Sequence, residues 1–311
     1  MGKNLLYEVI DMSKGKLLTP AQREAFLKVL RAGKLDRSVY SGSRLDLAYG
    51  DSPWQAMDLY LPESGADPFP TIVFIHGGGW EGGSKDDTQV MPFLRCLPHG
   101  WAVVSLEFRP IPHAIFPDNL YDIKRALRFL GETGKSYGLD PMRLVMAGAS
   151  AGAQLALMAA YTVGIPVYEG GPITDTYRII GAIDQFGVTD FLSFDRQFAQ
   201  SGCARFDDPE DPAPSSEDKV MGVACRKIPN LVRFACPLEA VHRAIPPTLI
   251  QHGRYDPMVP FQQSTELAAR IEAVAGPDRI RLCINEDCTH GDPKFGEGDR
   301  LREILDYLDS L

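Results

Sequence analysis

The chain lacks several features that identify whole classes of protein. It has no run of about 18 apolar residues, the minimum for a membrane-spanning helix. None of its six cysteines forms a CxxC pair or a zinc-ligand spacing. Charged residues interrupt Met1–Thr19, so this stretch has no apolar core of a secretory signal. We therefore expect a cytoplasmic protein with free buried thiols, no bound metal and no membrane partner.

Positive charge is scarce relative to negative charge. The chain has 32 lysines and arginines against 41 acidic residues, which gives a formal net charge of −9. Because an acidic surface repels a phosphate backbone, nucleic acid is excluded as a partner. The length of 311 residues and the hydrophobic content of 44% suit one large domain with an insertion, or two small domains.

Short apolar runs alternate with amphipathic patterns over most of the chain. Leu45–Tyr49 and Ala56–Leu61 predict an antiparallel pair of strands. Further strands, buried on both faces, are predicted at Thr71–Ile75, Trp101–Leu106, Arg143–Ala147, Ile179–Ile183, Thr248–Gln251 and Arg279–Ile284. Helices are predicted at Asp118–Leu130, Gln154–Ala160, Phe261–Val274 and Glu297–Leu308. This alternation predicts an α/β fold, with a mostly parallel eight-stranded sheet and helices on both faces.

Two segments fall outside that alternation. Residues 1–40 form an N-terminal extension with a predicted helix at Pro20–Arg31, which either packs over the site or covers a sheet edge. The main domain is expected at 41–311, with a cap or lid insertion at about 191–244. We expect that insertion to be partly helical around Ser216–Arg226, with Ser215 or Ser216 as the cap.

A G-x-S-x-G motif at Gly148–Gly152 marks a candidate nucleophile. It follows an apolar strand and opens a helix of small residues, which is the context of a nucleophile elbow. Gly148 and Gly152 allow close approach of two segments, and Ser150 would project at the helix N-terminus. The alternative interpretation is a small-residue strand–turn–helix junction with a capping serine.

Three consecutive glycines follow the strand at Thr71–Ile75. They belong to the stretch His76-Gly77-Gly78-Gly79-Trp80, and such a run is costly unless the backbone must face a ligand. Acyl transfer needs backbone N–H donors aimed at an oxyanion, and one donor is worth about 3 kcal/mol. We assign this role to Gly78 and Gly79, together with Ala151, and expect His76 to be structural. A phosphate-binding loop is the weaker alternative, since no Lys-Ser/Thr pair follows.

An acid and a base are needed to activate the serine. Asp256 follows the strand at Thr248–Gln251, and His290 follows the last strand, so both would lie at the carboxyl edge of a parallel sheet. His290 is the predicted general base and Asp256 the acid that orients it, with Asp287 and Glu286 as alternative acids. The chain order Ser150, Asp256, His290 fits this assignment. His99, His113 and His242 have no matching partner context.

Taken together, these motifs resemble a known family. The stretches are HGGGW, Glu107-Phe108-Arg109-Pro110, Phe116-Pro117-Asp118, GASAG, HGRYDPMVP and CTHGD. They are similar to those of the α/β-hydrolase esterases, and most of all to the bifunctional deacetylase/feruloyl esterase-like group, which adjoins the hormone-sensitive-lipase-like group. The resemblance covers roughly Leu45–Leu311, with Phe108 in place of the family's usual tyrosine.

The resemblance implies an α/β-hydrolase fold and a serine esterase. The implied activity is hydrolysis of short acyl esters, acetyl or aryl-acyl, on small molecules or carbohydrates, through an acyl-enzyme and without metal or cofactor. Two other hydrolases, an arylformamidase or a peptidase, would use the same three residues. A non-catalytic ligand receptor on this scaffold, as in gibberellin receptors, is disfavoured because His290 is present. The acyl group, the alcohol, the pathway and the oligomeric state, homo-oligomer included, stay open.

Overall fold

The computed structural model describes residues 17–30 and 33–311. Residues 1–16 of the predicted N-terminal extension, and residue 31 of the predicted helix, lie outside the described residues. Eight strands form one sheet. They are β1 (Arg44–Ala48), β2 (Ala56–Tyr60), β3 (Phe69–Ile75), β4 (Ala102–Leu106), β5 (Leu139–Ala149), β6 (Ile179–Gln185), β7 (Thr248–Gly253) and β8 (Ile280–Asn285).

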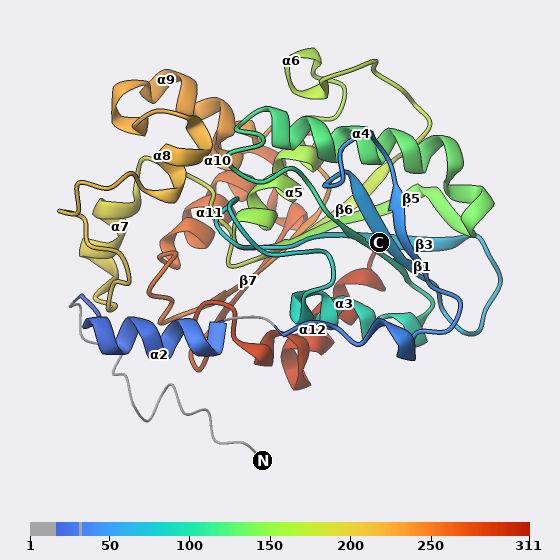
Figure 1. The fold of residues 1–311 in the computed structure, drawn as a ribbon, viewed down its shortest axis with the longest axis horizontal. Helices are drawn as coiled ribbons and strands as arrows, with labels where there is room; N and C mark the ends of the chain where they lie inside the picture. Colours follow the sequence, from blue (N-terminus) through green and yellow to red (C-terminus); the bar gives the residue numbers. More distant parts are fainter. Residues whose placement is uncertain (1–16, 31–32) are drawn as a thin grey trace.

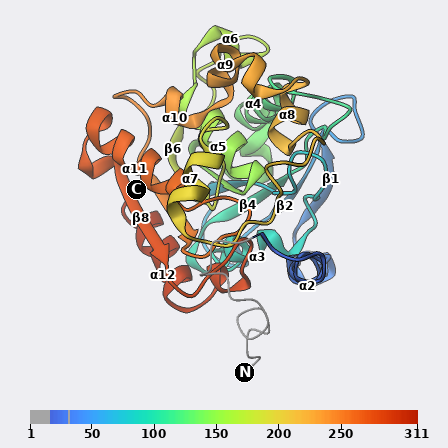
Figure 2. The same cartoon turned by 90° about the vertical axis from the view of Figure 1, so that its left-hand side faces the viewer.

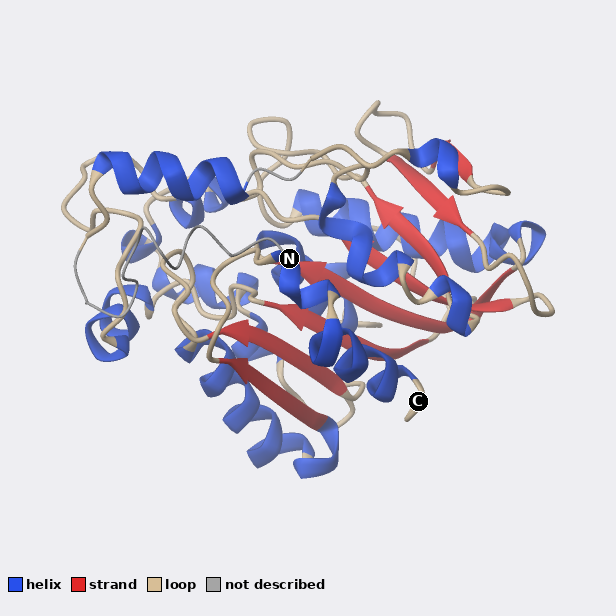
Figure 3. Cartoon of the chain, turned by 90° about the horizontal axis from the view of Figure 1, so that it is seen from below, coloured by secondary structure: helices blue, strands red, loops and turns tan. Residues whose placement is uncertain are grey.

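The strand order across the sheet is β1-β2-β4-β3-β5-β6-β7-β8. β2 runs antiparallel to both of its neighbours, and every pair from β4 to β8 is parallel. The predicted eight-stranded, mostly parallel sheet and its opening antiparallel pair are therefore confirmed. Because the strands from β3 to β8 are parallel, their carboxyl ends meet at one edge of the sheet (Figure 3).

Helices cover both faces of the sheet (Figure 1). In β3, Val73 and Ile75 face one core while Ile72 and Phe74 face the other, which explains the continuous apolar run. The first core is closed by the longer helices α4, α5 and α11, and the second by α3 and α12. Their bounds are α3 (Met91–Leu94), α4 (Asp118–Thr133), α5 (Ala151–Tyr161), α11 (Gln262–Ala275) and α12 (Gly298–Leu308).

The segment at 191–244 folds into a series of short helices. They are α7 (Phe194–Ser201), α8 (Ser216–Met221), α9 (Pro229–Val232) and α10 (Pro237–Ala240); α6 (Pro166–Glu169) lies earlier in the chain. Ser215 caps α8 by accepting the N–H of Asp218 at 3.1 Å, as the sequence predicts. The helix is shorter than predicted, because Gly222 takes a left-handed φ of 71° and ends it.

The predicted N-terminal helix is present as α2 (Pro20–Leu30). It lies at the end of the molecule toward which the central strands point (Figures 2 and 3). Before the helix, Leu17 pairs with Arg205, and after it, Lys34 pairs with Asp87. The segment thus crosses the carboxyl edge of the sheet from the loop that contains Arg205 (the 205 loop) to the loop that follows the three glycines.

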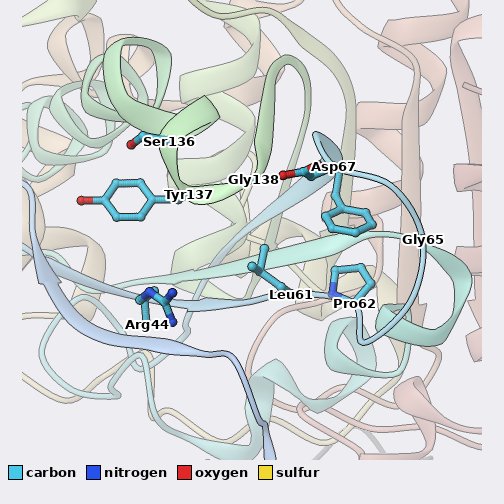
Figure 4. A pocket seen from close by; sticks show the side chains of 9 residues that line it. Arg44, Leu61, Pro62, Gly65, Asp67, Ser136, Tyr137 and Gly138 are labelled. Carbon is cyan, nitrogen blue, oxygen red and sulfur yellow. The ribbon is translucent and has the colours of Figure 1, made fainter.

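A cavity of about 400 Å³ opens at the opposite edge of the sheet (Figure 4). Phe69 and Gly138, at the amino ends of β3 and β5, help to line it. The candidate nucleophile follows the carboxyl end of β5, so this cavity is separate from the candidate site. None of the helices formed by residues 17–30 and 33–311 has the length and apolar character that spanning a bilayer requires.

Candidate active site

Ser150 stands alone between the last residue of β5 and the first residue of α5. Its backbone has φ 54° and ψ −122°, a conformation that side chains rarely adopt and that stores local strain. Its N–H donates to the carbonyl of Gln185 at 2.9 Å, and its own carbonyl accepts the N–H groups of Ala153 and Gln154. This sharp turn presents the half-buried hydroxyl at the start of the helix.

Gly152 brings the serine next to the glycine-rich loop. A Cβ atom at this position would collide with the carbonyl oxygens of Ile75 and His76, at the end of β3. Only glycine therefore lets α5 pack this closely against β3. The consequence is that the stretch His76–Trp80 begins beside the first turn of α5.

The loop after β3 offers backbone N–H groups to solvent. Gly78 has φ 126° and Gly79 φ 61°, and neither is fully buried. Within the described ranges 17–30 and 33–311, no acceptor is found for the N–H of Gly78 or Gly79. Ala151 is the first residue of α5, and a first-turn N–H has no partner inside its helix. These donors are therefore available to an anionic ligand beside Ser150.

Two other residues of this loop hold its shape. His76 is 2% exposed; its Nε2 lies 2.8 Å from a carboxylate oxygen of Glu107, and its ring stacks on Phe108. Trp80 is buried and donates its indole N–H to Gln154 at 3.1 Å. Both contacts are buried and join the loop to neighbouring elements.

The predicted acid and base meet the serine. Nε2 of His290 lies 2.9 Å from Oγ of Ser150, and Nδ1 of His290 lies 2.6 Å from Oδ2 of Asp256. Asp256 is 1% exposed, and its Oδ1 accepts the N–H groups of Met258 and Val259, both at 2.8 Å. Ser150 and His290 lie 140 residues apart in the sequence, yet the three side chains form one continuous hydrogen-bonded chain.

The electrostatics of Asp256 favour a carboxylate. Burial alone would raise its pKa, but the charge of His290 and the hydrogen bonds from His252 and His290 outweigh that effect and lower the pKa to about 2. Asp256 is thus ionised near neutral pH. An ionised partner holds the Nδ1–H tautomer, which leaves Nε2 of His290 free to accept the proton of Ser150.

The alternative acids lie elsewhere. Asp287 forms ion pairs with Lys294 and Arg300, and Glu286 is exposed. The acid beside His290 is therefore Asp256. Among the other histidines, Nε2 of His242 lies 2.9 Å from the carbonyl of Tyr161, away from the serine.

Sequence reasoning missed two residues that contact the hydrogen-bonded series formed by Ser150, His290 and Asp256. Nε2 of His252 lies 3.2 Å from Oδ2 of Asp256, and the only available signal was the i,i+4 spacing of these two residues. The ring of Phe186 stands edge-on to that of His290, with centroids 4.8 Å apart. Phe186 has φ 45°, a strained backbone for which the sequence offers no signal.

The segment at 191–244 and the N-terminal helix both reach the edges of the site. A Cβ atom on Gly79 would lie 3.3 Å from Oγ of Ser216, the first residue of α8. Lys219 of the same helix forms an ion pair with Glu81 at 3.0 Å. On the other side, a Cβ atom on Gly291 would collide with the side chain of Leu30, in α2. Within residues 17–30 and 33–311, no group of three or more His, Cys, Asp or Glu side chains is placed to hold a metal ion.

Comparison with known proteins places these features in context. The sequence profile of the BD-FAE family matches residues 57–271. Esterase LipC of Mycobacterium tuberculosis is 28% identical over 237 residues, which is 75% of this chain and 56% of that protein. Isoprenylcysteine alpha-carbonyl methylesterase ICME of Arabidopsis thaliana is 23% identical over 265 residues, which is 80% of this chain and 56% of that protein. The chain thus spans about half the length of these curated relatives.

Solved structures share the architecture. A truncated carbohydrate esterase from gut microbiota superposes with a TM-score of 0.76 at 22% identity, covering 89% of this chain and 99% of that one. The esterase Est2 of Thermogutta terrifontis superposes with a TM-score of 0.65 at 24% identity, covering 91% and 95%. At these identities the likeness establishes the fold, which is that of the α/β-hydrolases, and leaves the substrate to be argued from the site.

Proposed function

The chain belongs to the BD-FAE family, and on that premise we propose that it is a serine carboxylic ester hydrolase in which Ser150, His290 and Asp256 act as a catalytic triad. The observation that carries the proposal is the unbroken hydrogen-bonded chain from Oγ of Ser150 through His290 to Asp256. The available N–H groups of Gly78, Gly79 and Ala151 beside the serine support it.

In the proposed reaction, His290 first removes the proton of Ser150. Oγ of Ser150 attacks the ester carbonyl carbon while Nε2 of His290 takes the hydroxyl proton, and the negative charge that develops on the carbonyl oxygen is held by the backbone N–H groups. The bond to the alcohol oxygen then breaks as Nε2 returns the proton to it, which leaves an acyl-enzyme. A water molecule repeats the sequence, gives up its proton to His290 and releases the acid and free Ser150.

We propose short acyl groups, acetyl or aryl-acyl, as the group transferred, with a small-molecule or carbohydrate alcohol. The names of relatives support an ester but differ in the rest of the substrate, since one is an isoprenylcysteine alpha-carbonyl methylesterase and one structural neighbour a carbohydrate esterase. The buried aromatic side chains of Trp80, Phe186 and Phe191 lie close to the glycine loop and to His290, with Trp80 and Phe191 in ring contact at 5.4 Å. We infer that bulky rings packed around the serine favour a short acyl chain over a long one.

Replacement of the serine tests the reaction. We expect Ser150→Ala to lower kcat on a short-chain ester by several orders of magnitude while substrate still binds, because only the nucleophile is removed. A fluorophosphonate should label the wild-type protein at Ser150 and leave the variant unlabelled. Ser136→Ala, an exposed serine at the opposite edge of the sheet, is the matched control and should keep full activity. More than about a tenth of wild-type activity in Ser150→Ala would refute the assignment.

A series of chromogenic esters tests the acyl group. We expect acetate and butyrate esters to be cleaved with higher kcat/KM than long-chain esters, because the rings around the site restrict the acyl chain. Equal kcat/KM on long chains would contradict the short-acyl proposal while leaving the triad intact. Faster turnover of N-formylkynurenine than of any ester would instead favour the arylformamidase alternative.

A further inference from the structure

His252 lies at the carboxyl end of β7, completely buried and outside the proposed triad. Its Nδ1 lies 2.6 Å from Oγ of Ser264 in α11. Its Nε2 lies 3.0 Å from the carbonyl oxygen of Val259 and 3.2 Å from Oδ2 of Asp256. The imidazole therefore contacts Ser264 on one side, and Asp256 with the turn that carries it on the other.

The neighbours of His252 determine where its proton is. A backbone carbonyl can only accept hydrogen bonds, so Nε2 carries a proton and donates it to Val259, while Oδ2 of Asp256 lies 3.2 Å from the same nitrogen. The hydroxyl of Ser264 can donate to Nδ1 or accept from it, so the donation from Nε2 holds whichever way that contact runs. Oδ2 of Asp256 thus accepts from Nδ1 of His290 at 2.6 Å and faces the N–H of His252 on its other side.

The same imidazole also holds the turn on which the carboxylate sits. Val259 accepts from His252 through its carbonyl and donates through its N–H to Oδ1 of Asp256 at 2.8 Å. His252, Val259 and the carboxylate are therefore linked in a closed loop, made of two hydrogen bonds and the 3.2 Å contact between His252 and Asp256. Rotation of the carboxylate away from His290 would break the donor contacts on both of its oxygens.

We propose that His252 is a positioning residue for the hydrolysis reaction, which holds the Asp256 carboxylate in the orientation that receives Nδ1–H of His290. This inference rests on the proposed function. It assigns His252 no contact with substrate: it acts through Asp256. Because the triad geometry must be held to a fraction of an ångström, loss of this donor should lower the turnover rate more than substrate binding.

Three other titratable groups face this cluster. Asp184 of β6 interacts electrostatically with His252. The thiol of Cys203 interacts with Asp256 in the same way. His290 lies on the far side of the Asp256 carboxylate. Burial raises the pKa of Asp184 to about 6, in the range where a histidine base titrates. An experiment on pH dependence must therefore include an Asp184→Asn background.

Four variants test the role of the donor. His252→Phe fills the ring volume without a donor, and His252→Asn is polar but too short to reach Oδ2. His252→Gln places an amide N–H near the position of Nε2 and should rescue. His242→Phe, an exposed histidine far from the serine, is the matched control. For each variant, kcat, KM, the pH profile of kcat/KM and the melting temperature are measured, with active sites counted by a phosphonate titrant.

We expect His252→Phe and His252→Asn to lose about tenfold or more in kcat per titrated site, with KM changed by less than about threefold. With one donor removed, more of the carboxylate's charge acts on His290. The acid limb of the profile, which is the pH range over which kcat/KM falls on acidification, should therefore move to higher pH. The same move is expected in the Asp184→Asn background. His252→Gln should keep kcat within about threefold of wild type, with the acid limb unmoved.

Two results would overturn the proposal. One is a folded His252→Asn or His252→Phe variant with wild-type kcat and acid limb, and the other is equal loss in His252→Gln and His252→Asn. If His252→Phe does not fold, the comparison of Gln with Asn decides. Phosphonate labelling of Ser150 in the wild-type protein separates failure of the His252 proposal from failure of the proposed function. An unlabelled, inactive wild type would refute the triad. A labelled wild type leaves only the role of His252 in question.

Discussion

Asp184 is a buried carboxyl group with only one of its oxygens hydrogen-bonded. Oδ1 accepts the N–H of Gly187 at 2.8 Å, while Oδ2 has no partner among residues 17–30 and 33–311. Burial raises its pKa to about 6, against the lowering effects of His252 and of the Gly187 N–H. Asp256, also buried, shows the opposite shift, because two imidazoles and two backbone N–H groups stabilise its charge.

The raised pKa of Asp184 predicts a pH-dependent stability. Between about pH 4 and pH 6 the unfolded chain gives up this proton and the folded chain keeps it, so the stabilisation present below pH 4 is lost as the pH rises through 6. A shift of about two units corresponds to about 3 kcal/mol. We expect Asp184→Asn to resemble wild type at pH 4 and to be more stable at pH 8, as measured by chemical unfolding at both values. A difference that does not change with pH would contradict this.

Asp256 has the opposite linkage. Because its pKa is lowered to about 2, its stabilising contribution is present above about pH 4 and is lost only as the pH falls toward 2. Loss of the proposed activity between pH 7 and 5 should therefore leave Asp256 ionised and be reversible, without unfolding caused by this carboxylate. Circular dichroism recorded along the same pH series checks this, since coincident loss of structure would assign the acid limb to unfolding instead.

At the scale of elements, α2 is held by a small apolar cluster of its own. Phe26 is 1% exposed and contacts Phe206 with ring centroids 5.9 Å apart, and Leu18 and Ala204 complete the buried group. Tyr255, which precedes Asp256, packs against the same cluster. The helix therefore braces the loop of the proposed catalytic acid while contributing little to the two main cores.

Phe26→Ala tests this attachment. Removal of a buried ring costs about 3 kcal/mol or more, and because the cluster is separate from the main cores, the loss should appear first as local opening of residues 17–30. We expect faster limited proteolysis within that segment than in the rest of the chain. Lys28→Ala, which removes only an exposed ion pair with Glu24, should leave the cleavage rate unchanged. Equal proteolysis of Phe26→Ala and wild type would show that the cluster does not hold the helix.

At the scale of the whole molecule, one buried ion pair joins the helical layer. Lys124 of α4 is fully buried, and its ammonium contacts Glu169 at 3.0 Å and the carbonyl of Ala159 in α5 at 3.1 Å. Glu169 also accepts the N–H of Gly164 at 2.8 Å. Burial lowers the pKa of Lys124 to about 8, and the charge of Glu169 opposes that shift.

Breaking this pair should destabilise the entire domain. Glu169→Gln leaves a buried ammonium without its counter-charge, at a cost of about 3–5 kcal/mol. Addition of Lys124→Met removes that charge and should recover most of the loss, because no buried ammonium is then left without a counter-charge. Unfolding free energies of both single variants and the double variant measure the coupling. Additive losses in the double variant would contradict it.

Local sequence patterns were enough for much of this protein. Continuous apolar runs such as Thr71–Ile75 identified strands that are buried on both faces, and the small residues around Ser150 identified a strand–turn–helix junction, because each pattern reflects a demand of the local backbone. The placement of Asp256 and His290 at strand ends could also be predicted, since parallel strands bring their carboxyl ends to one edge.

Other features were decided only by tertiary packing. The burial of Asp184, the position of Leu30 beside Gly291 and that of Ser216 beside Gly79 leave no local signature. They arise between segments far apart in the chain, or from burial that depends on every neighbouring element. By itself, the sequence determined the strands, the longer helices and the three side chains at the sheet edge, because periodicity and glycine placement are local properties. Tertiary structure alone decided which segments close around them, because a long-range contact depends on the geometry of both partners at once.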